Sequence, residues 1–436
     1  MTKILLIGNG AREHVIAETL KNSPQKPKIF SFMKANNPGI KSLSEKVSLG
    51  NYNELETIKN FAVENEVDFA FIGPEEPLNN GVVDALEKIG VKSVGPKKSL
   101  ARLETSKSFT RELLSKHKID ASPKFKICSS ADEAREFVEE LDEFVVKPDG
   151  LTGGKGVWVQ GDHFKTKHDG LKYAEKVLKT HNSVVIEEKI EGEEFSLMSF
   201  ADGKHIFDFP PVQDHKRAFE NDSGPNTGGM GSYSVNNHLL PFLTKKDVDD
   251  AHEITQKVLH AISKENREPY KGVMYGGFMV TKNGVRLIEY NARFGDPEAM
   301  NVLPILNNDL VELSYNVIEG NLNRAKPDFK QLSTVCKYVV PNGYPDNPVK
   351  NQKIEIGYHP EYANLYYASV DMRTDGLYMT GSRAVAFVGI AQNINDAEKI
   401  AEKCASEVKG QVFHRRDIGT EKLLMKRIEH MRKIRG

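Results

Sequence analysis

Two side chains with oxygen atoms suited to metal binding, Glu289 and Asn291, stand two residues apart in a stretch with strand character. Side chains two apart on a strand project from the same face, so a carboxylate and an amide would point together. This pair suits Mg²⁺, which takes one or two protein oxygens and completes its shell with water and phosphate. Arg293 would continue the same face and place a cation where a transferred phosphoryl group carries charge. An edge strand with polar residues facing water has the same spacing, so both interpretations stay open.

A glycine-rich segment, residues 147–157, lies between two expected strands, 144–147 and 157–160. It is not a Walker A loop, because its glycine spacing differs and no Ser or Thr follows Lys155. Its glycines let the backbone approach a phosphate closely, and Lys147 and Lys155 supply charge. We expect a hairpin flap over phosphates, although a mobile surface hairpin fits the same pattern.

A hydrophobic strand, expected over residues 183–188, runs into a cluster of acids. These acids are Glu187, Glu188, Glu191, Glu193 and Glu194. Acids so close repel one another, and burying them together without a partner would be unfavourable. A ribose hydroxyl pair or an adenine amino group would each need such an acceptor. Taken alone, however, the cluster favours a solvated acidic hinge.

The first expected strand, Lys3–Ile7, runs through a turn at residues 8–10 into a helical pattern over residues 13–20. A dinucleotide fingerprint would need a third glycine where Glu13 stands, and no acid closes the second strand to hold a ribose. What remains is a tight strand-to-helix turn with exposed amides. It is either a weak anion site or a purely structural turn.

Two further polar segments carry weaker signals. Residues 213–231 form a long glycine-rich excursion, and loops of this size inside a domain are usually functional or disordered. His215 in this excursion lacks a second His or Cys at metal-ligand spacing, and the chain has no Gly-x-Ser-x-Gly elbow. The basic segment at Arg415 and Arg416 favours a solvated helix or a local phosphate contact over a nucleic-acid patch.

The composition is that of a globular protein with about three domains, given 436 residues, 39% hydrophobic and 28% charged. A formal net charge of −1 argues against bulk attraction to nucleic acid or anionic membranes. The three cysteines are an odd number without metal-ligand spacing, which favours reduced thiols. The first apolar run is too short for a signal peptide, and no stretch approaches a membrane span. We therefore expect a cytoplasmic protein.

The order of expected elements divides the chain into three domains. Residues 1–103 alternate strands and helices, as the βα units of an open parallel sheet do. Residues 104–326 mix strands with amphipathic helices and contain a small strand-and-helix lid at about 123–192. Residues 327–436 combine short strands and turns with a helix begun by Asn395.

Four local signals locate elements within these domains. A turn at residues 73–77 follows the strand Phe69–Ile72, at the edge where open α/β sheets bind ligands. Lys107–Lys116 has a helical pattern, and Ser130 with Glu133 has the spacing of a capping box. Apolar residues recur at helical spacing over residues 248–262, which predicts a helix with one buried face.

Taken together, the flap, the acidic hinge and the Glu-x-Asn strand resemble the ATP-grasp fold. The motifs also match, in order, those of the phosphoribosylamine–glycine ligase family. The matching segments are 8–14, 73–78, 147–156, 213–217, 224–231, 293–298 and 416–419. The joint occurrence of these motifs over nearly the whole chain is far more specific than any one of them.

This resemblance implies an α/β and α+β multidomain protein. It would have a Rossmann-like pre-ATP-grasp domain, an ATP-grasp domain with a small lid module, and a C-terminal α+β domain. The implied reaction is ATP-dependent ligation of glycine to 5-phosphoribosylamine through a glycyl phosphate, in purine biosynthesis. The implied cofactors are ATP with Mg²⁺ or Mn²⁺. The implied partners are small molecules, with no nucleic acid or membrane, and the enzyme would be a monomer.

The resemblance also assigns residues by motif. Those expected around ATP are Lys107, Lys147, Gly153, Gly154, Lys155, Gly156, Glu187, Glu188, Lys189 and Glu194, with Glu187 and the hinge backbone at adenine and Glu194 at the ribose. Glu289 and Asn291 would bind the metal. The catalytic set would be Arg293, Lys155 and Asp214. Those expected around the other substrates are Asn9, Gly10, Glu75, Asp214, Lys216, Gly228, Gly229, Arg293, Arg415 and Arg416.

The chain also departs from the family pattern. Ala11 stands where a second glycine is usual, residues 34–39 differ from the common bacterial run, and Pro148 replaces an alanine. The chain looks closer to archaeal-type members. The strand before Glu289 offers no acid, so we expect two protein ligands for the metal, and Asp296 and Glu298 receive no role. Two rivals remain: an ATP-grasp ligase that activates bicarbonate or formate, and a non-catalytic nucleotide-binding regulator.

Overall fold

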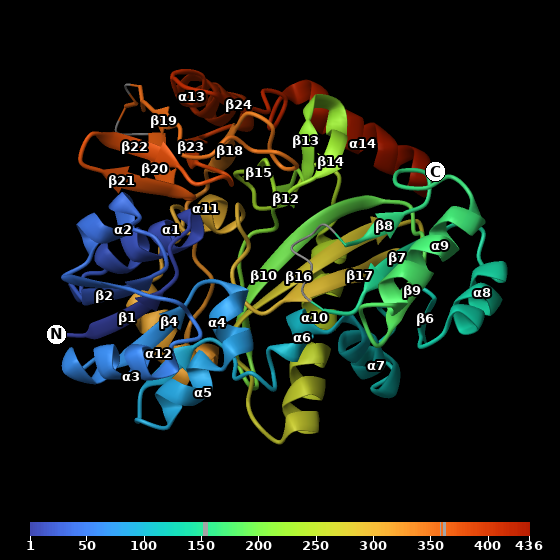
Figure 1. Cartoon of the computed structure of the whole chain (residues 1–436), viewed down its shortest axis with the longest axis horizontal. Coiled ribbons are helices and arrows are strands. Elements are labelled where there is room, and N and C mark those ends of the chain that lie inside the picture. The colour runs from blue at the N-terminus through green and yellow to red at the C-terminus, as the bar shows by residue number, and fades with distance from the viewer. Residues whose placement is uncertain (151–155, 358, 361–362) are drawn as a thin grey trace.

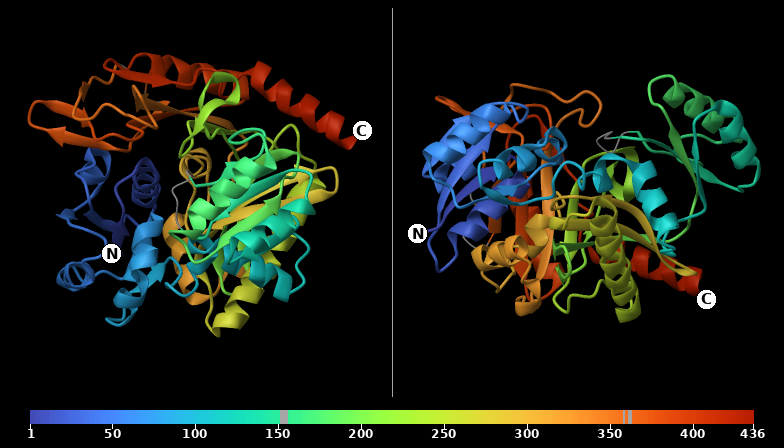
Figure 2. Two further views of the ribbon diagram at one scale, coloured as in Figure 1. Left: turned by 45° about the vertical axis from the view of Figure 1, so that its right-hand side comes forward. Right: turned by 90° about the horizontal axis from the view of Figure 1, so that it is seen from below.

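The computed structural model describes residues 1–150, 156–357, 359–360 and 363–436. The N-terminal sheet lies beside a central antiparallel sheet, and a lid module stands on the far side of that sheet (Figure 1). The C-terminal sheet covers the top of both and sends its last helix across toward the lid side (Figures 1 and 2). Within these ranges, no helix is both long and apolar enough to cross a membrane.

The N-terminal region is a parallel sheet in the order β3-β2-β1-β4-β5. Its strands are β1 (Lys3–Ile7), β2 (Lys28–Met33), β3 (Lys46–Leu49), β4 (Phe69–Ile72) and β5 (Lys92–Val94). The helices that cover it are α1 (Ala11–Lys21), α2 (Pro38–Leu43), α3 (Leu55–Glu64), α4 (Glu75–Asn80) and α5 (Val82–Glu87). Residues 4–7 of β1 are fully buried, as expected of a parallel strand covered on both faces, and the predicted open parallel sheet is confirmed.

The expected turn after β4 is wrong in one respect, because helix α4 already begins at Glu75. Pro74 is its N-cap, and Pro77 lies in its first turn. Backbone N–H groups in the first turn of a helix have no partner within the helix, so proline costs no hydrogen bond there. The helix therefore tolerates the residue that suggested a turn. Its start places Glu75 at the carboxyl edge of the sheet.

A short helix, α6 (Arg102–Thr105), and the confirmed helix α7 (Lys107–Lys116) lead to the lid. The lid sheet has the order β6-β9-β7-β8. Its elements are β6 (Phe125–Cys128), α8 (Ala131–Glu139), β7 (Phe144–Pro148), β8 (Trp158–Val159), α9 (Lys167–Leu178) and β9 (Val184–Glu188). The buried apolar residues of the lid form a cluster of their own, so its core is separate from the main core.

The predicted capping box in the lid is only half formed. Ser130 Oγ accepts from the Glu133 amide at 3.2 Å, as expected. The Glu133 carboxylate bonds instead to the amide and hydroxyl of Ser129 at 2.7 and 3.0 Å. The helix therefore starts where the sequence indicates, with one reciprocal bond shifted by a residue.

The central sheet is antiparallel in the order β11-β10-β16-β17. Its strands are β10 (Glu193–Asp202), β11 (Ile206–Asp208), β16 (Lys271–Thr281) and β17 (Gly284–Asn291). Helix α10 (Lys245–Asn266) packs against it through the predicted apolar stripe, with Ala251, Val258 and Ile262 fully or almost fully buried.

A bulge in β17 changes the expected alternation. Gly277 on β16 pairs with Glu289 but the next residue, Phe278, pairs with Leu287, so Ile288 is an extra residue. Buried positions accordingly run Leu287 and then Tyr290, a spacing of three. Bulges commonly redirect side chains beside active sites. This one leaves Glu289 and Asn291 together on the face away from the buried Tyr290.

The polar excursion is joined to the C-terminal sheet, because β15 pairs with β18. The excursion contains β12 (Gln213–Asp214), β13 (Arg217–Phe219), η1 (Glu220–Asp222), β14 (Ser223–Asn226) and β15 (Gly231–Ser234). After β17 come α11 (Ala299–Val302), α12 (Leu310–Glu319) and η2 (Leu322–Arg324). The sequence placed both the excursion and the C-terminal strands but not the pairing that unites them.

The C-terminal sheet has the order β12-β15-β18-β23-β20, with β24 on β18, and a smaller sheet has the order β19-β22-β21. The elements are β18 (Ser333–Pro341), β19 (Lys353–Ile354), β20 (Ala363–Tyr367), β21 (Val370–Arg373), β22 (Gly376–Met379), β23 (Val385–Ala391), α13 (Ile394–Ser406), β24 (Val412–His414) and α14 (Glu421–Arg435). The N-cap of α13 is Asn393, so the expected start at Asn395 is two residues late.

Asn37 joins the first and last sheets. Its side-chain amide donates to the Asn9 carbonyl at 2.9 Å and to the Tyr367 carbonyl at 2.7 Å. Its Oδ1 accepts from the Gly39 and Ile40 amides and so caps α2. His14 lies nearby and accepts from the Tyr367 amide at 3.1 Å. Segment 34–39, which departs from the bacterial pattern, therefore joins the two regions through the buried Asn37.

Candidate active site

A cavity of about 710 Å³ opens where the N-terminal, central, lid and C-terminal regions meet. It brings together many of the side chains singled out in the sequence. Those that line it are Glu75, Lys107, Lys147, Glu187, Glu194, Asp214, Lys216, Gly228, Glu289, Asn291 and Arg293. They come from segments up to about 220 residues apart, and the sheet order explains their meeting.

Several expected residues lie elsewhere. Gly153, Gly154 and Lys155 lie outside the described residues. Of the described ones, those outside the cavity lining are Asn9, Gly10, Gly156, Glu188, Lys189, Gly229, Arg415 and Arg416. Gly229 nevertheless adjoins the cavity, since a Cβ placed on it would lie 2.6 Å from Asp214 Oδ1. The side chains of Glu188 and Lys189 bond to Lys124 and Glu143, and the expected role of their backbone stays a prediction.

Glu289 and Asn291, the expected metal ligands, both line the cavity. On the opposite strand, Gly277 pairs with Glu289 and Tyr275 with Asn291, so that strand supplies no acid at this register. Among the described residues, no group of three or more His, Cys, Asp or Glu is placed to hold a metal. One carboxylate and one amide suit a hard divalent cation that keeps water and phosphate ligands.

Arg293 does not extend the strand, because β17 ends at Asn291. Its guanidinium is nevertheless held beside the metal pair, and Nη2 donates to Asn291 Oδ1 at 3.1 Å. Nη2 also lies 3.0 Å from Glu104 Oε1, and Nε lies 3.5 Å from Glu75 Oε2. Burial raises the pKa of Glu104 despite this cation. The two acids hold the Arg293 guanidinium beside Asn291 in the lining of the cavity.

Glu187 lines the cavity between two cations, and its expected contact with adenine stays a prediction. Its Oε1 accepts from Arg111 Nε and its Oε2 lies beside Lys147 Nζ, both at 2.6 Å. Burial alone would raise the pKa of Glu187, but the charges of Arg111 and Lys147 outweigh it and lower the pKa to about 2. Glu187 is therefore an ionised anchor for Lys147, and both of its carboxylate oxygens contact cations.

Arg111 was not predicted from the sequence to have a role in the site. Its side chain connects the lid to strand β17. Its Nη1 and Nη2 donate to the carbonyls of Leu287 and Ile288 at 3.0 and 2.9 Å, at the β17 bulge. Arg111 follows Lys107 by one helical turn on α7, and that spacing was a usable signal for a shared face. The bulge beside Glu289 is thus fixed by a side chain that also holds Glu187.

Replacing Arg111 by methionine is expected to lower the free energy of unfolding by about 3–5 kcal/mol, because it leaves Glu187 buried with one cation instead of two. Urea unfolding measures this loss. The matched control is Arg135→Met on the lid surface, where the side chain is 56% exposed and its loss should be within about 0.5 kcal/mol. Equal midpoints for the two variants would refute the anchoring role of Arg111.

Lys216 and Glu194 pair across the mouth of the cavity at 2.9 Å. The charge of Lys216 lowers the pKa of Glu194, and Glu194 in turn raises that of Lys216. Both side chains remain more than a third exposed, so water and ligands reach them. Lys107 lies deeper, donates to the Gly150 carbonyl at 2.9 Å, and has its pKa lowered by burial.

Asp214 and Glu298 place two carboxyl groups in the cavity, of which Glu298 is buried and Asp214 is half-buried. Burial and the neighbouring Glu298 raise the pKa of Asp214 well above its usual range. Glu298 is 2% exposed and accepts from the Tyr275 hydroxyl at 2.7 Å. Glu298, left without a role by the sequence, therefore belongs to the cavity.

Arg383 is a second cavity residue that the sequence missed. It reaches in from the C-terminal region and donates to the carbonyls of Gly229 and Asp296 at 3.0 and 2.9 Å. Its side chain lies over the Tyr338 ring at 4.4 Å. No local motif marks it, because its partners are about 90 to 150 residues away along the chain.

Arg415 and Arg416 do not line the cavity, and their expected contact with phosphoribosylamine stays a prediction. Arg415 is 1% exposed and is engaged by Asp222 and Asp417 at 3.1 and 2.8 Å. Arg416 has a side chain that is 72% exposed, with Glu402 at 3.7 Å as its ion partner. Neither side chain lines the cavity, because β24 and the following turn direct one into the protein and the other outward.

The turn at residues 8–10 is bonded to a nearby acid, Glu13 of helix α1. Gly10 N donates to Glu13 Oε2 at 2.6 Å, in a capping box that satisfies the start of α1. Asn9 Oδ1 accepts from the Tyr52 hydroxyl at 2.6 Å. The Glu13 carboxylate thus gives the turn a structural role, and the expected substrate contacts of Asn9 and Gly10 stay predictions.

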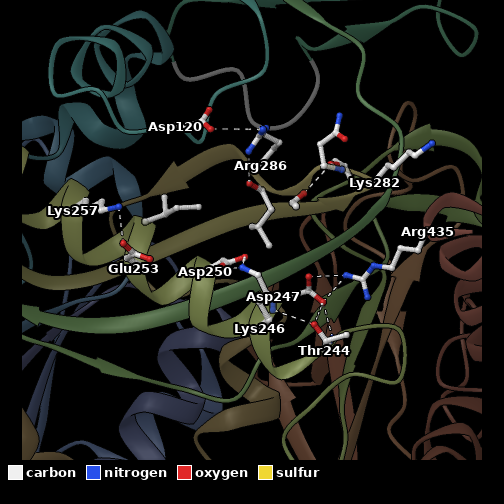
Figure 3. A pocket seen from close by; sticks show the side chains of 15 residues that line it. Asp120, Thr244, Lys246, Asp247, Asp250, Glu253, Lys257, Lys282, Arg286 and Arg435 are labelled. Carbon is white, nitrogen blue, oxygen red and sulfur yellow. Dashed lines mark hydrogen bonds and ion pairs between the residues drawn. The ribbon is translucent and has the colours of Figure 1, made fainter.

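A second hollow of about 570 Å³ lies between the start of α10 and the β16–β17 turn. Its charged side chains pair with one another, including Asp120 with Arg286, Glu253 with Lys257 and Asp247 with Arg435 (Figure 3). None of the residues predicted from the sequence to bind substrate, nucleotide or metal is among those that line it. Many of those residues line the larger cavity instead.

Comparisons with known proteins agree with this geometry along the chain. Models of phosphoribosylglycinamide synthetase match residues 2–104 (N domain), 105–299 (ATP-grasp (A) domain) and 334–421 (C domain). The phosphoribosylamine–glycine ligase of Methanocella arvoryzae is 48% identical over 434 residues, covering 100% of both chains. That of Methanocaldococcus jannaschii is 49% identical over 444 residues, covering 99% of this chain and 100% of the relative. The crystal structure of the Thermotoga maritima ligase has a TM-score of 0.80 at 26% identity, covering 95% of this chain and 100% of that one.

Proposed function

This chain belongs to the phosphoribosylglycinamide synthetase family, and on that premise we propose how the groups in its cavity divide the reaction. The chain is an ATP-dependent ligase of purine biosynthesis that joins glycine to 5-phosphoribosylamine. Its products are glycinamide ribonucleotide, ADP and phosphate. The observation that carries the assignment is the meeting of Lys107, Lys147 and Arg293 with Glu289 and Asn291 in one cavity.

The reaction proceeds in two steps in our proposal. A glycine carboxylate oxygen forms a bond to the terminal phosphorus of ATP, and the bond to the bridging oxygen breaks to release ADP. The amine of phosphoribosylamine then attacks the glycyl phosphate carbonyl and expels phosphate. A free carboxylate is a poor acyl donor, so phosphorylation supplies the leaving group, while positioning and charge neutralisation supply most of the catalysis.

Each region contributes a group to these steps. Lys107 and Lys147 bind the phosphates, with Lys155 of the flap as a further proposed contact. Arg293 stabilises the transferring phosphoryl group. Glu289 and Asn291 hold the divalent metal, Mg²⁺ or Mn²⁺, which supplies charge neutralisation when it is bound.

We call the part of the cavity proposed to bind phosphoribosylamine and glycine the acceptor side. Its residues are Asp214, Lys216 and Gly228, together with Glu75 from α4. We place Glu194 at the ribose of ATP, and the backbone near Lys189 at adenine. Domain limits at 1–103, 104–326 and 327–436, a monomeric state and a cytoplasmic location complete the proposal. The net charge of −1 supports small molecules rather than nucleic acid or membrane as its partners.

The substrate assignment is tested by ADP release. Glycine with phosphoribosylamine should give turnover, whereas bicarbonate or formate in place of glycine should give less than about 1% of that rate, because neither carries the ammonium group that the carboxyl groups of the cavity can contact. Turnover with bicarbonate or formate alone would contradict the assignment. ATP binding without turnover on any of these acids would favour a nucleotide-binding regulator instead.

A further inference from the structure

The tip of the polar excursion, residues 220–223, has an unfavourable backbone conformation. Asn221 and Asp222 both have φ of +59°, in the left-handed region that residues with a side chain seldom adopt. Two such residues in succession need support from outside the turn. The same excursion carries Asp214 and Lys216 into the cavity, so whatever supports its tip also bears on the acceptor side.

That support comes from the C-terminal segment. Asp222 Oδ2 lies 2.6 Å from Arg427 Nη2, and its Oδ1 lies 3.1 Å from Arg415 Nη2. The backbone amide of Asn221 donates to Asp417 Oδ2 at 2.9 Å. Burial would raise the pKa of Asp222, but His215 and the two arginines outweigh it and lower the pKa. The turn is thus held in its strained form by charges outside the excursion.

Arg427 also contacts β10, the strand that begins at Glu193 in the acidic hinge. Its Nη1 lies 3.3 Å from Glu193 Oε2, and the other oxygen of Glu193 accepts from His430 Nδ1 at 2.6 Å. Glu193 directly precedes Glu194, the acid that pairs with Lys216. Helix α14 runs beside β13 and β14 in both views (Figures 1 and 2). The Arg427 guanidinium therefore connects two elements. One is β10, which begins beside the proposed ribose site, and the other is the turn η1 in the excursion that carries Asp214 and Lys216.

We propose that Arg427 is a positioning residue, which holds Asp222 and Glu193 together and so sets Lys216 and Asp214 against the ATP hinge. This inference rests on the proposed function for the identity of the substrates. Arg427 lies on the cavity wall, but its charge is turned to the two acids. From the sequence we expected a solvated basic helix at the C-terminus. In the proposal this helix instead holds the acceptor side in place through Arg427, and we call this arrangement the clamp.

The test combines steady-state kinetics with hydrogen exchange of the full-length chain. Arg427→Met should lower kcat/KM for glycine about 30–100-fold, because small misplacements of reacting groups have effects of this size. The KM for ATP should change less, and amide protection should fall at residues 213–226 while it is kept in β16. The control is Arg432→Met, an exposed arginine on the same helix, which should stay within about twofold of wild type.

A double-mutant cycle identifies the path of the effect. If Arg427 acts through Asp222, the double variant Arg427→Met with Asp222→Asn should be no worse than the more impaired single variant. Multiplicative losses, or a wild-type kcat/KM for Arg427→Met, would overturn the proposal. If Arg427→Met does not fold, Arg427→Lys decides, since a single ammonium cannot bridge both acids and should still lose about tenfold; wild-type kinetics for it would likewise overturn the clamp.

Failure of the clamp and failure of the proposed function give different results. A wild-type chain that releases no ADP with glycine and phosphoribosylamine contradicts the function. In that case the exchange measurement still decides the clamp, because it needs no substrate. Equal protection of residues 213–226 in wild type and Arg427→Met would then refute the clamp.

Discussion

Replacing Glu289 by alanine is expected to lower kcat by at least about 10³-fold, equivalent to about 4 kcal/mol of transition-state stabilisation, while the protein still folds. Glu289 supplies the carboxylate of the pair that faces the cavity, and the opposite strand offers glycine at that register. Among the described residues no third acid, His or Cys completes a cluster that would replace it. The measurement is ADP release at saturating ATP and glycine, with circular dichroism as the check on folding.

Two further variants make this result specific to the metal. Asn291→Asp keeps an oxygen ligand and should retain activity within about tenfold of wild type, with a lower metal concentration at half-maximal rate. Glu253→Ala removes an exposed acid of α10 and should leave the rate unchanged. If Glu289→Ala turned over within a few-fold of wild type, the metal assignment would be wrong.

The bulge in β17 marks the limit of what strand periodicity can predict. The alternation of Val285 and Leu287 identified the strand, and Glu289 and Asn291 do lie on one face. However, Ile288 is an extra residue between Leu287 and Glu289. Its position depends on the pairing of β17 with Gly277 and Phe278 and on Arg111 from α7. Gly277 and Phe278 belong to the neighbouring strand and Arg111 lies 177 residues before Ile288, so the pattern within β17 carries no information about them.

Charged residues were the hardest to assign from sequence. Glu187 sits in the expected acidic hinge, yet Arg111 and Lys147 engage both its oxygens. Glu13 stands where a fingerprint glycine is missing, and it occupies the helix start that looked open to a ligand. A sequence shows that an acid is present, but whether a ligand or a cation neutralises it is decided by tertiary packing.

Elements with strong local patterns were predicted well. The helix Lys107–Lys116 and the strand Phe69–Ile72 have the predicted bounds, because capping residues and continuous apolar runs determine them. Arg383 could not be found in this way. It enters the cavity from the C-terminal region and contacts backbone carbonyls, for which no side-chain motif exists.

Arg293 is expected to be needed for both turnover and stability, and the two roles can be separated. Arg293→Met should abolish measurable ADP release, since the group beside the transferring phosphoryl charge is lost. It should also lower the free energy of unfolding by about 3–5 kcal/mol, because Glu104 is left buried without its cation at 3.0 Å. Adding Glu104→Gln removes the unpaired charge, so the double variant should recover most of the stability and none of the activity.

The pH dependence of the single variant follows from Glu104. Burial already raises the pKa of Glu104 above its ordinary 4.5, and loss of Arg293 raises it further. A carboxyl group with a raised pKa in the folded state contributes stability below its unfolded pKa, and this contribution is lost as the pH rises through the folded pKa. Arg293→Met should therefore lose stability relative to wild type as the pH rises above 4.5, the ordinary pKa of a glutamate, and the double variant with Glu104→Gln should not. Urea unfolding across this range measures both; a pH-independent deficit would show that Arg293 supports the fold by packing rather than by neutralising Glu104.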